Sequence, residues 1–226
     1  MTANISPKPV PSLTELRIGG LARLSSCDWP GELVATVFCQ GCPWRCGYCH
    51  NPHLLPADSS TPIAWGDVLS FLRSRRGLLD GVVLSGGEPT LQTQLPKAIA
   101  ELRALGFRIG LHSAGPYPDR LAALLPQLDW IGFDVKAPFA EYERITGVPG
   151  SGERAKESLQ HILASGIAFE ARTTVHPALL NEDAVQRLRA DLAALGVTEH
   201  RIQQFRPIGC ADHRLNAAAA DASAAA

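Results

Sequence analysis

Apolar and polar positions along the chain form two patterns, one of short β-branched runs and one of longer stretches with helical spacing. The short runs are rich in apolar and β-branched residues, and the first of them is nearly all apolar, which is typical of a strand that is buried on both faces. They lie at residues 33–38, 82–84, 108–112, 130–135, 168–175 and 202–205. Helical stretches separate them, at residues 63–75, 95–105, 119–125, 153–164 and 182–195. The last of these has Asn181 as its expected N-cap and Gly196 as its expected stop.

The alternation of strands and helices predicts an α/β fold. Strands that are joined through helices pair in parallel, with right-handed crossovers. The predicted strands are too few for a closed eight-stranded barrel, so we expect a partial (β/α)6 barrel that resembles an incomplete TIM barrel. Ahead of the first strand, residues 16–24 surround the pair Gly19-Gly20, and this pattern predicts a short N-terminal β-hairpin with its turn at the two glycines.

The two ends of the chain differ in composition from the alternating part. Residues 1–12 contain three prolines and little apolar pattern, and we expect them to be a flexible lead-in. Residues 13–210 carry the predicted strands and helices and form the expected single domain. Residues 211–226 are mostly alanine, and we expect a disordered tail there.

The bulk composition is that of an ordinary globular protein able to bury a full core. Of the 226 residues, 46% are hydrophobic and 19% are charged, and the formal net charge is −1. Without a basic excess we expect no nucleic-acid partner. The sequence contains neither an 18-residue apolar run nor a charged start followed by an apolar stretch. We therefore expect no membrane partner and no signal peptide.

Cysteines are concentrated in one short stretch. Four of the six lie between positions 39 and 49, which is typical of a cofactor site in a reducing cytosol and predicts a cytoplasmic protein. Cys42, Cys46 and Cys49 are close enough in sequence to converge on one metal centre. Thiolates suit zinc, copper(I) or iron–sulfur clusters. Zinc and ferredoxin sites use four ligands with other spacings, so three cysteines suggest a four-iron cluster with one iron open to a small molecule.

Two alternatives remain at this point. The three cysteines resemble a fragment of a zinc knuckle, and Cys39 forms a Cys-x-x-Cys pair with Cys42 that would close the cluster with a fourth ligand. We expect Cys39 instead to be a buried strand residue, because free cysteine often acts as a small hydrophobic side chain.

The spacing Cys42-x3-Cys46-x2-Cys49, with Tyr48 just before the third cysteine, resembles the signature of the radical S-adenosylmethionine (radical SAM) superfamily. The resemblance implies that these cysteines hold a [4Fe–4S] cluster whose open iron chelates the amino and carboxylate groups of S-adenosylmethionine. It also implies that an external flavodoxin- or ferredoxin-type reductant supplies one electron, that the sulfonium C–S bond breaks, and that a 5′-deoxyadenosyl radical forms.

Polar groups recur where the predicted parallel strands end, which is the edge of such a sheet where ligands gather. These positions are Gly86, Gly87, Glu88, His112, Ser113, Asp134, Lys136, Arg172 and Thr174. Taken alone, Gly86-Gly87 is more typical of a plain turn with a solvated Glu88, and a surface salt bridge is the alternative for Asp134 with Lys136. None of the histidines is assigned a catalytic role.

The resemblance gives these residues roles toward S-adenosylmethionine. Gly86, Gly87 and Glu88 match a motif that holds the amino group of the methionine moiety, and a backbone group at Tyr48 meets adenine. Further cofactor contacts are implied for the strand-end residues Ser113, Asp134, Lys136, Arg172 and Thr174.

Further motifs resemble the activating enzymes of glycyl-radical enzymes, and most closely the activating proteins of anaerobic ribonucleoside-triphosphate reductase. They are Asp28-x-Pro30-Gly31, Gln40-Gly41-Cys42, Cys49-His50-Asn51-Pro52, the run from Ser85 to Gln92, and Asp134-Val135-Lys136-Ala137-Pro138. The resemblance covers Leu16 to Phe205 and implies that the partner is a glycyl-radical enzyme, namely anaerobic ribonucleotide reductase. Relatives often carry Asp-Thr-Asn-Gly where this chain has His112-Ser113-Ala114-Gly115, which removes the basis for a cation site that uses that aspartate.

Several other functions stay open at this stage. Within the superfamily, the partner is alternatively pyruvate formate-lyase or another glycyl-radical enzyme, or the substrate is a small molecule. From other classes, an electron-transfer protein would use four cysteine ligands, and a zinc-binding interaction module would be colourless.

Overall fold

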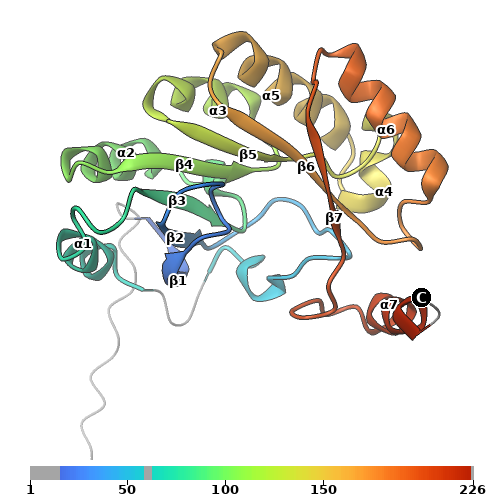
Figure 1. Cartoon of the computed structure of the whole chain (residues 1–226), viewed down its shortest axis with the longest axis horizontal. Coiled ribbons are helices and arrows are strands. Elements are labelled where there is room, and N and C mark those ends of the chain that lie inside the picture. Colours follow the sequence, from blue (N-terminus) through green and yellow to red (C-terminus); the bar gives the residue numbers. More distant parts are fainter. Residues whose placement is uncertain (1–15, 59–62, 225–226) are drawn as a thin grey trace, which may run out of the picture.

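The computed structural model describes residues 16–58 and 63–224, and the predicted lead-in over residues 1–12 lies outside this part. The chain forms one seven-stranded sheet in which the strands follow one another in sequence order (Figure 1). The strands are β1 (Ile18–Ser25), β2 (Val34–Cys39), β3 (Gly81–Gly86), β4 (Arg108–Ser113), β5 (Trp130–Asp134), β6 (Phe169–Val175) and β7 (His200–Gln204). β1 is antiparallel to β2, and every later pair is parallel. Because β1 and β7 are not paired with each other, the sheet is open.

Helices cover one face of this curved sheet (Figure 1). They are α1 (Trp65–Arg73), α2 (Leu95–Ala104), α3 (Pro118–Leu124), α4 (Tyr142–Thr146), α5 (Ser151–Ser165) and α6 (Glu182–Ala194), and α7 (His213–Ala224) follows the last strand. The Asn181 side chain accepts a hydrogen bond from the Ala184 amide and caps α6, as predicted. The expectation of an open α/β fold with parallel strand–helix units is confirmed.

The two faces of the sheet carry separate apolar clusters. Alternate strand residues on the helix-covered face join the main core, as Val37, Leu84 and Ile131 do. On the other, concave face a smaller cluster is formed by Val34, Val83, Trp130 and Trp29. Successive residues of a strand point to opposite faces of the sheet. Because both faces are apolar here, strands such as β2 and β3 are nearly continuous hydrophobic runs in the sequence.

Trp29, from the loop between β1 and β2, fills the concave face near the strands' amino ends. Its ring stacks on Trp130 with centroids 5.5 Å apart, and the Arg108 guanidinium lies 4.7 Å from the Trp29 ring centroid. A Cβ at Gly110 would lie 2.9 Å from the Trp29 ring, and one at Gly81 3.1 Å from it. Glycines on neighbouring strands therefore make the space for the Trp29 ring. Because this ring fills the concave face near the amino ends of the strands, the polar site is confined to their carboxyl ends.

An N-terminal antiparallel pair is present, but it is formed by β1 and β2, and residues 16–24 contain no turn at Gly19-Gly20. Both glycines lie inside β1, where Gly20 pairs with Phe38 of β2, and the connection spans residues 26–33. A register shift interrupts the ladder between Ile18 and Gly20, and a Cβ at Gly19 would overlap Leu54 and Gln40. The glycine pair thus marks a bulge with close side-chain approach rather than a turn.

The prediction of a disordered tail over residues 211–226 is wrong for most of that segment. Residues 213–224 form α7, which is consistent with the high helix propensity of alanine. Leu215 is buried, and its carbonyl oxygen lies 3.0 Å from the Nε2 atom of buried His176. The alanine-rich composition therefore encodes a helix whose first turn is anchored to the domain.

Candidate active site

The cysteine loop, residues 40–49, follows the carboxyl end of β2 and is held by backbone hydrogen bonds at its start and its middle. The Gly41 and Cys42 amides donate to the carbonyl oxygens of Leu54 and Leu55, at 2.8 and 3.1 Å. The Arg45 amide donates to the Thr146 carbonyl oxygen at 2.9 Å, which ties the middle of the loop to α4. The loop therefore presents its three cysteines from a fixed backbone.

Gly86 and Gly87, at the end of β3, pack directly against this loop. The Gly87 amide donates to the Cys39 carbonyl oxygen at 2.9 Å, and the Glu88 amide donates to the Gly41 carbonyl oxygen at 2.8 Å. A Cβ at Gly86 would overlap the Cys39 backbone, and one at Gly87 would overlap Gly41. These two amides are therefore not free for a ligand, and the glycine pair allows two backbones to meet at the base of the cysteine loop.

Glu88 is buried, and its carboxylate links the ends of β3 and β4. Oε1 accepts hydrogen bonds from the Thr90 amide, the Thr90 hydroxyl and the Ser113 hydroxyl, at 3.1, 2.6 and 2.9 Å. Oε2 accepts one from the Ala114 amide at 3.0 Å. Burial raises the pKa of Glu88, and these donors oppose that shift because they favour the charged form. The Glu88 carboxylate, which the resemblance assigns to the amino group of the methionine moiety, therefore already accepts hydrogen bonds that hold the ends of β3 and β4 together.

Two thiols of the loop, those of Cys42 and Cys46, lie in surroundings that disfavour unpaired thiolates. Burial, with a contribution from the Glu88 charge, raises the pKa of Cys42 to about 12, and burial also raises the pKa of Cys46. All three cysteines are partly buried and unpaired. Cys39 is different, because it is fully buried at the end of β2 and its backbone pairs with Gly86. Its burial supports the expectation that it is a core residue.

Asp134 and Lys136 at the end of β5 meet Arg172 of β6. Arg172 Nε donates to Asp134 Oδ1 at 2.5 Å, and Lys136 Nζ donates to Asp134 Oδ2 at 3.1 Å. Burial alone would raise the pKa of Asp134, but the two neighbouring cations lower it below its ordinary value. Burial lowers the pKa of Lys136, and the Asp134 charge outweighs this and raises it. The result is an ionised triad with a net positive charge on the concave side of the sheet.

Tyr48 joins this triad from the cysteine loop. Its side chain is buried, its ring centroid lies 5.8 Å from Lys136 Nζ, and its hydroxyl is buried without a hydrogen-bond partner among the described residues. A buried hydroxyl without a partner is costly. The site therefore contains one polar atom without a hydrogen-bond partner within the part of the chain that the structure describes, the Tyr48 hydroxyl oxygen, on a ring that lies next to Lys136.

Two residues that the sequence interpretation did not assign complete this arrangement. The Tyr142 hydroxyl accepts a hydrogen bond from the Lys136 amide at 2.9 Å, and its ring packs edge-on against Trp44. His112 bridges the sheet, since Nε2 lies 2.7 Å from the Asp28 carbonyl oxygen and Nδ1 3.0 Å from the Ser85 hydroxyl. A carbonyl oxygen only accepts, so Nε2 carries the proton. Burial, with a contribution from Arg172, lowers the pKa of His112 to about 4, and the ring is neutral.

The sequence-predicted residues thus fall into two connected groups. Gly86, Gly87, Glu88 and Ser113 form the support beneath the cysteine loop, while Tyr48, Asp134, Lys136 and Arg172 line the concave side. Thr174 lies two residues beyond Arg172 on the same face of β6, and its side chain makes no hydrogen bond within the described part of the chain. The sequence placed His112 at this edge of the sheet without giving it a role, whereas no sequence signal identified Tyr142 as a neighbour of this site.

The cysteine loop also borders a cavity of about 490 Å³. Cys46, Gly47 and Cys49 line one side of it, and residues 211–214, which lead into α7, line the other. Figure 1 shows α7 at the same edge of the sheet as the carboxyl end of β7.

Among the described residues, no helix is both long and apolar enough to cross a membrane.

The match to a protein family settles the general chemistry of this site. The family described as the radical SAM superfamily matches residues 36–190, which include the cysteine loop and the strands β3 to β6. The chain belongs to the radical SAM superfamily. The expectation of an enzyme that uses a [4Fe–4S] cluster and S-adenosylmethionine is confirmed at this level.

Curated relatives narrow the comparison within the radical SAM superfamily. A protein of Methanocaldococcus jannaschii, provisionally named a glycyl-radical enzyme activating enzyme, is 28% identical over 200 residues, which cover 84% of this chain and 80% of that protein. The pyruvate formate-lyase-activating enzyme of Clostridium pasteurianum is 27% identical over 169 residues, covering 72% of this chain and 70% of the relative.

Solved structures of radical SAM proteins share the fold. SuiB of Streptococcus suis bound to its precursor peptide SuiA has a TM-score of 0.60 at 12% identity, over 82% of this chain and 44% of that one. The enzyme anSMEcpe with bound AdoMet has a TM-score of 0.59 at 14% identity, over 74% of this chain and 49% of that one. This radical SAM chain therefore spans less than half the length of these two structures, and the likeness concerns the fold alone.

The residues of the radical SAM site fit the cofactors of the superfamily. Cys42, Cys46 and Cys49 would hold the cluster, because they provide three thiol donors on one fixed loop and a metal would compensate their buried charge. The Asp134–Lys136–Arg172 triad places a net positive charge on the concave side, which would complement the carboxylate of a ligand.

Proposed function

We propose that this radical SAM enzyme is an activase that installs a glycyl radical on a partner enzyme, and that the partner is anaerobic ribonucleoside-triphosphate reductase. The observation that carries the proposal is the placement of the three-cysteine loop and the Asp134–Lys136–Arg172 triad at the same open edge of the sheet. The sequence motifs around this edge resemble those of glycyl-radical enzyme activases. Two curated relatives carry names from the same class.

The chain's own residues provide binding, orientation and charge. Lys136, held by Asp134, would face the carboxylate of S-adenosylmethionine, and Arg172 fixes the Asp134 side chain from the neighbouring strand. Glu88 holds the ends of β3 and β4 at a constant separation below the cysteine loop. When bound, the cluster and S-adenosylmethionine supply one-electron cleavage of a C–S bond and hence a carbon radical. We infer that a peptide segment of the partner approaches at the open side of the sheet, where β1 and β7 are not paired with each other.

The proposal is tested by mixing the reconstituted, reduced protein and S-adenosylmethionine with purified anaerobic ribonucleotide reductase under anaerobic conditions. The expected result is the doublet electron paramagnetic resonance (EPR) signal of a glycyl radical on the reductase. A variant of the reductase with alanine at the radical-bearing glycine is the control and should give no doublet. Cleavage of S-adenosylmethionine without a doublet would contradict the assignment of this partner.

A second partner is supported by the relative from Clostridium pasteurianum, whose name states that it activates pyruvate formate-lyase. The same assay with pyruvate formate-lyase in place of the reductase separates the two. A doublet on pyruvate formate-lyase alone would move the activase to that partner while leaving its reaction type unchanged.

A further inference from the structure

We propose that the surface formed by the cysteine loop and the segment 206–214 is the docking site of a small acidic protein that carries one electron. The proposal rests on the proposed function, because an activase of this type needs an electron from outside the chain. The surface is defined here by Arg45, Gly47, Arg206, Ile208 and Arg214, and is called the entry face below.

The segment that follows β7 is packed onto the cysteine loop although the two are far apart in sequence. His50 Nε2 lies 2.9 Å from the Arg206 carbonyl oxygen, and Cys210 Sγ lies 3.7 Å from the Gly47 carbonyl oxygen. A Cβ at Gly209 would overlap the His50 carbonyl oxygen. The segment is thus a fixed part of the wall around the cysteines.

Two of the three cysteines reach solvent on this side. Cys46 and Cys49 line the cavity of about 490 Å³ between the loop and residues 211–214, and Gly47 between them is exposed. The concave side of the sheet, by contrast, is occupied by Tyr48 and the Asp134 triad. An electron donor that approaches through the entry face reaches the cysteines without entering the S-adenosylmethionine site.

The entry face is cationic. Arg45 and Arg206 are exposed, and their guanidinium groups make no ion pair or hydrogen bond within the described residues. Arg214, with 92% of its side chain exposed, pairs only with Asp212, two residues earlier, and Asp212 is the one acid lining the cavity among the residues described. Opposite charge on a partner accelerates encounter without requiring a large interface.

An exposed apolar side chain lies within this charged surface. Ile208 is 86% exposed, the highest value among the large apolar residues described, and it is held between Arg206 and the Gly209–His50 contact. Short-lived electron-transfer complexes bury little area. One apolar side chain close in sequence to Arg206, on a segment that also carries Arg214, fits such a complex, and the charge complements an acidic carrier rather than a basic or neutral one.

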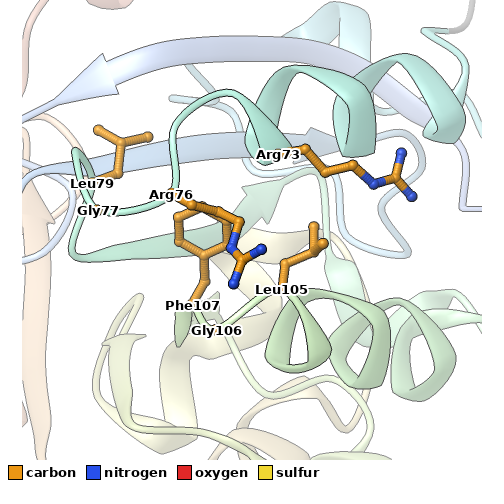
Figure 2. Close-up of a pocket in the computed structure, with 7 residues that line it drawn as sticks. All are labelled: Arg73, Arg76, Gly77, Leu79, Leu105, Gly106 and Phe107. Atoms are coloured by element: carbon orange, nitrogen blue, oxygen red, sulfur yellow. The ribbon is translucent and has the colours of Figure 1, made fainter.

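Another arginine cluster provides a matched control. Arg73 and Arg76 border a cavity of about 550 Å³ with Leu105 and Phe107, between the segments that follow α1 and α2 (Figure 2). These segments lead into the amino ends of β3 and β4, whereas the cysteines follow the carboxyl end of β2. In a parallel sheet these are opposite edges, so this cluster carries the same charge at the wrong place for electron entry.

The test is the rate at which a flavodoxin hydroquinone of net negative charge reduces the reconstituted cluster, followed by anaerobic stopped-flow absorbance at low ionic strength. Arg206→Glu should lower the second-order rate constant by about tenfold, because it replaces attraction with repulsion at the contact. Ile208→Asp should lower it as well. The control Arg76→Glu should stay within about twofold of wild type, and added salt should slow the wild type.

Equal rates for wild type, Arg206→Glu and Ile208→Asp would overturn the proposal. So would a normal reduction rate in Arg206→Glu combined with weaker radical transfer to the glycyl-radical enzyme, because the face would then belong to that partner. Iron content and reduction by dithionite, which needs no docking, should be the same in all variants. Cleavage of S-adenosylmethionine after dithionite reduction is scored separately, since its absence would contradict the proposed function and not the docking result.

Discussion

At the scale of single residues, the site is built from buried polar groups whose partners are other strand ends. Glu88 receives hydrogen bonds from Thr90, Ser113 and Ala114, and His112 connects the Asp28 backbone with the Ser85 hydroxyl. None of these contacts joins neighbours in sequence except the one to Thr90. The network therefore fixes the distances between strands. Substitutions that keep the shape of a side chain but exchange its hydrogen-bond donors and acceptors should therefore lower the stability of the protein.

Glu88→Gln tests this network. Both carboxylate oxygens accept hydrogen bonds, so an amide in the same place would turn one NH2 group toward a donor. We expect the free energy of unfolding to fall by roughly 2–3 kcal/mol, since a buried donor or acceptor would lose its partner. Urea denaturation of the protein measures it, with the exposed Glu157→Gln as the matched control. A loss no larger than that of the control would show that the carboxylate is not bound as described.

The pH dependence of stability tests His112. Its pKa is lowered from 6.5 to about 4 in the folded protein by burial and by Arg172. Between these values the unfolded chain binds the extra proton, so stability falls as the pH drops from 6.5 toward 4, by roughly 3 kcal/mol in total for this group. His200, whose pKa is also lowered by burial, adds a change of the same sign.

His112→Gln should flatten this pH dependence even though it also lowers stability at neutral pH. Thermal unfolding of wild type and His112→Gln, measured across this range, provides the comparison. An unaltered slope in His112→Gln would mean that the imidazole is protonated in the folded state.

At the scale of elements, the glycines at the end of β3 are as important to the cysteine loop as the loop's own residues. Gly87→Ala would push a Cβ into the Gly41 backbone, whereas a Cβ at Gly47, inside the loop, would meet nothing within 4 Å. We therefore expect Gly87→Ala to lose most of its iron after reconstitution and Gly47→Ala to keep it. Iron and sulfide analysis of the two variants decides this, and similar iron contents in both would contradict the packing argument.

The elements also show where sequence interpretation succeeds and fails. The strand ends that carry Glu88, Asp134 and Arg172 were predictable, because parallel strands place their carboxyl ends at one edge of a sheet. Gly19-Gly20 was misassigned as a turn because a bulge and a turn both select glycine, and only the contacts with Leu54 and Gln40 distinguish them. The packing of Gly87 against the cysteine loop, where its amide donates to the Cys39 carbonyl oxygen, also has no local signal in the sequence.

At the scale of the whole molecule, chain segments that are remote in sequence enclose one reaction edge. Trp29 closes the concave face at the amino ends of the strands, and no pattern in the sequence indicated that the loop before β2 would enter the sheet's interior. Residues 211–226 were assigned to a disordered tail, yet residues 213–224 form α7, and Cys210 just before them packs against Gly47 of the cysteine loop. Such contacts depend on the final fold, which local composition does not reveal.

The central claim is that three cysteines hold a four-iron cluster with one iron open to S-adenosylmethionine. The most direct test is EPR spectroscopy of the anaerobically reconstituted, reduced protein with and without S-adenosylmethionine. We predict that S-adenosylmethionine changes the cluster spectrum, that Cys39→Ala behaves like wild type, and that Cys42→Ala has no four-iron signal. A spectrum that does not respond to S-adenosylmethionine, or a cluster that needs Cys39, would contradict the account.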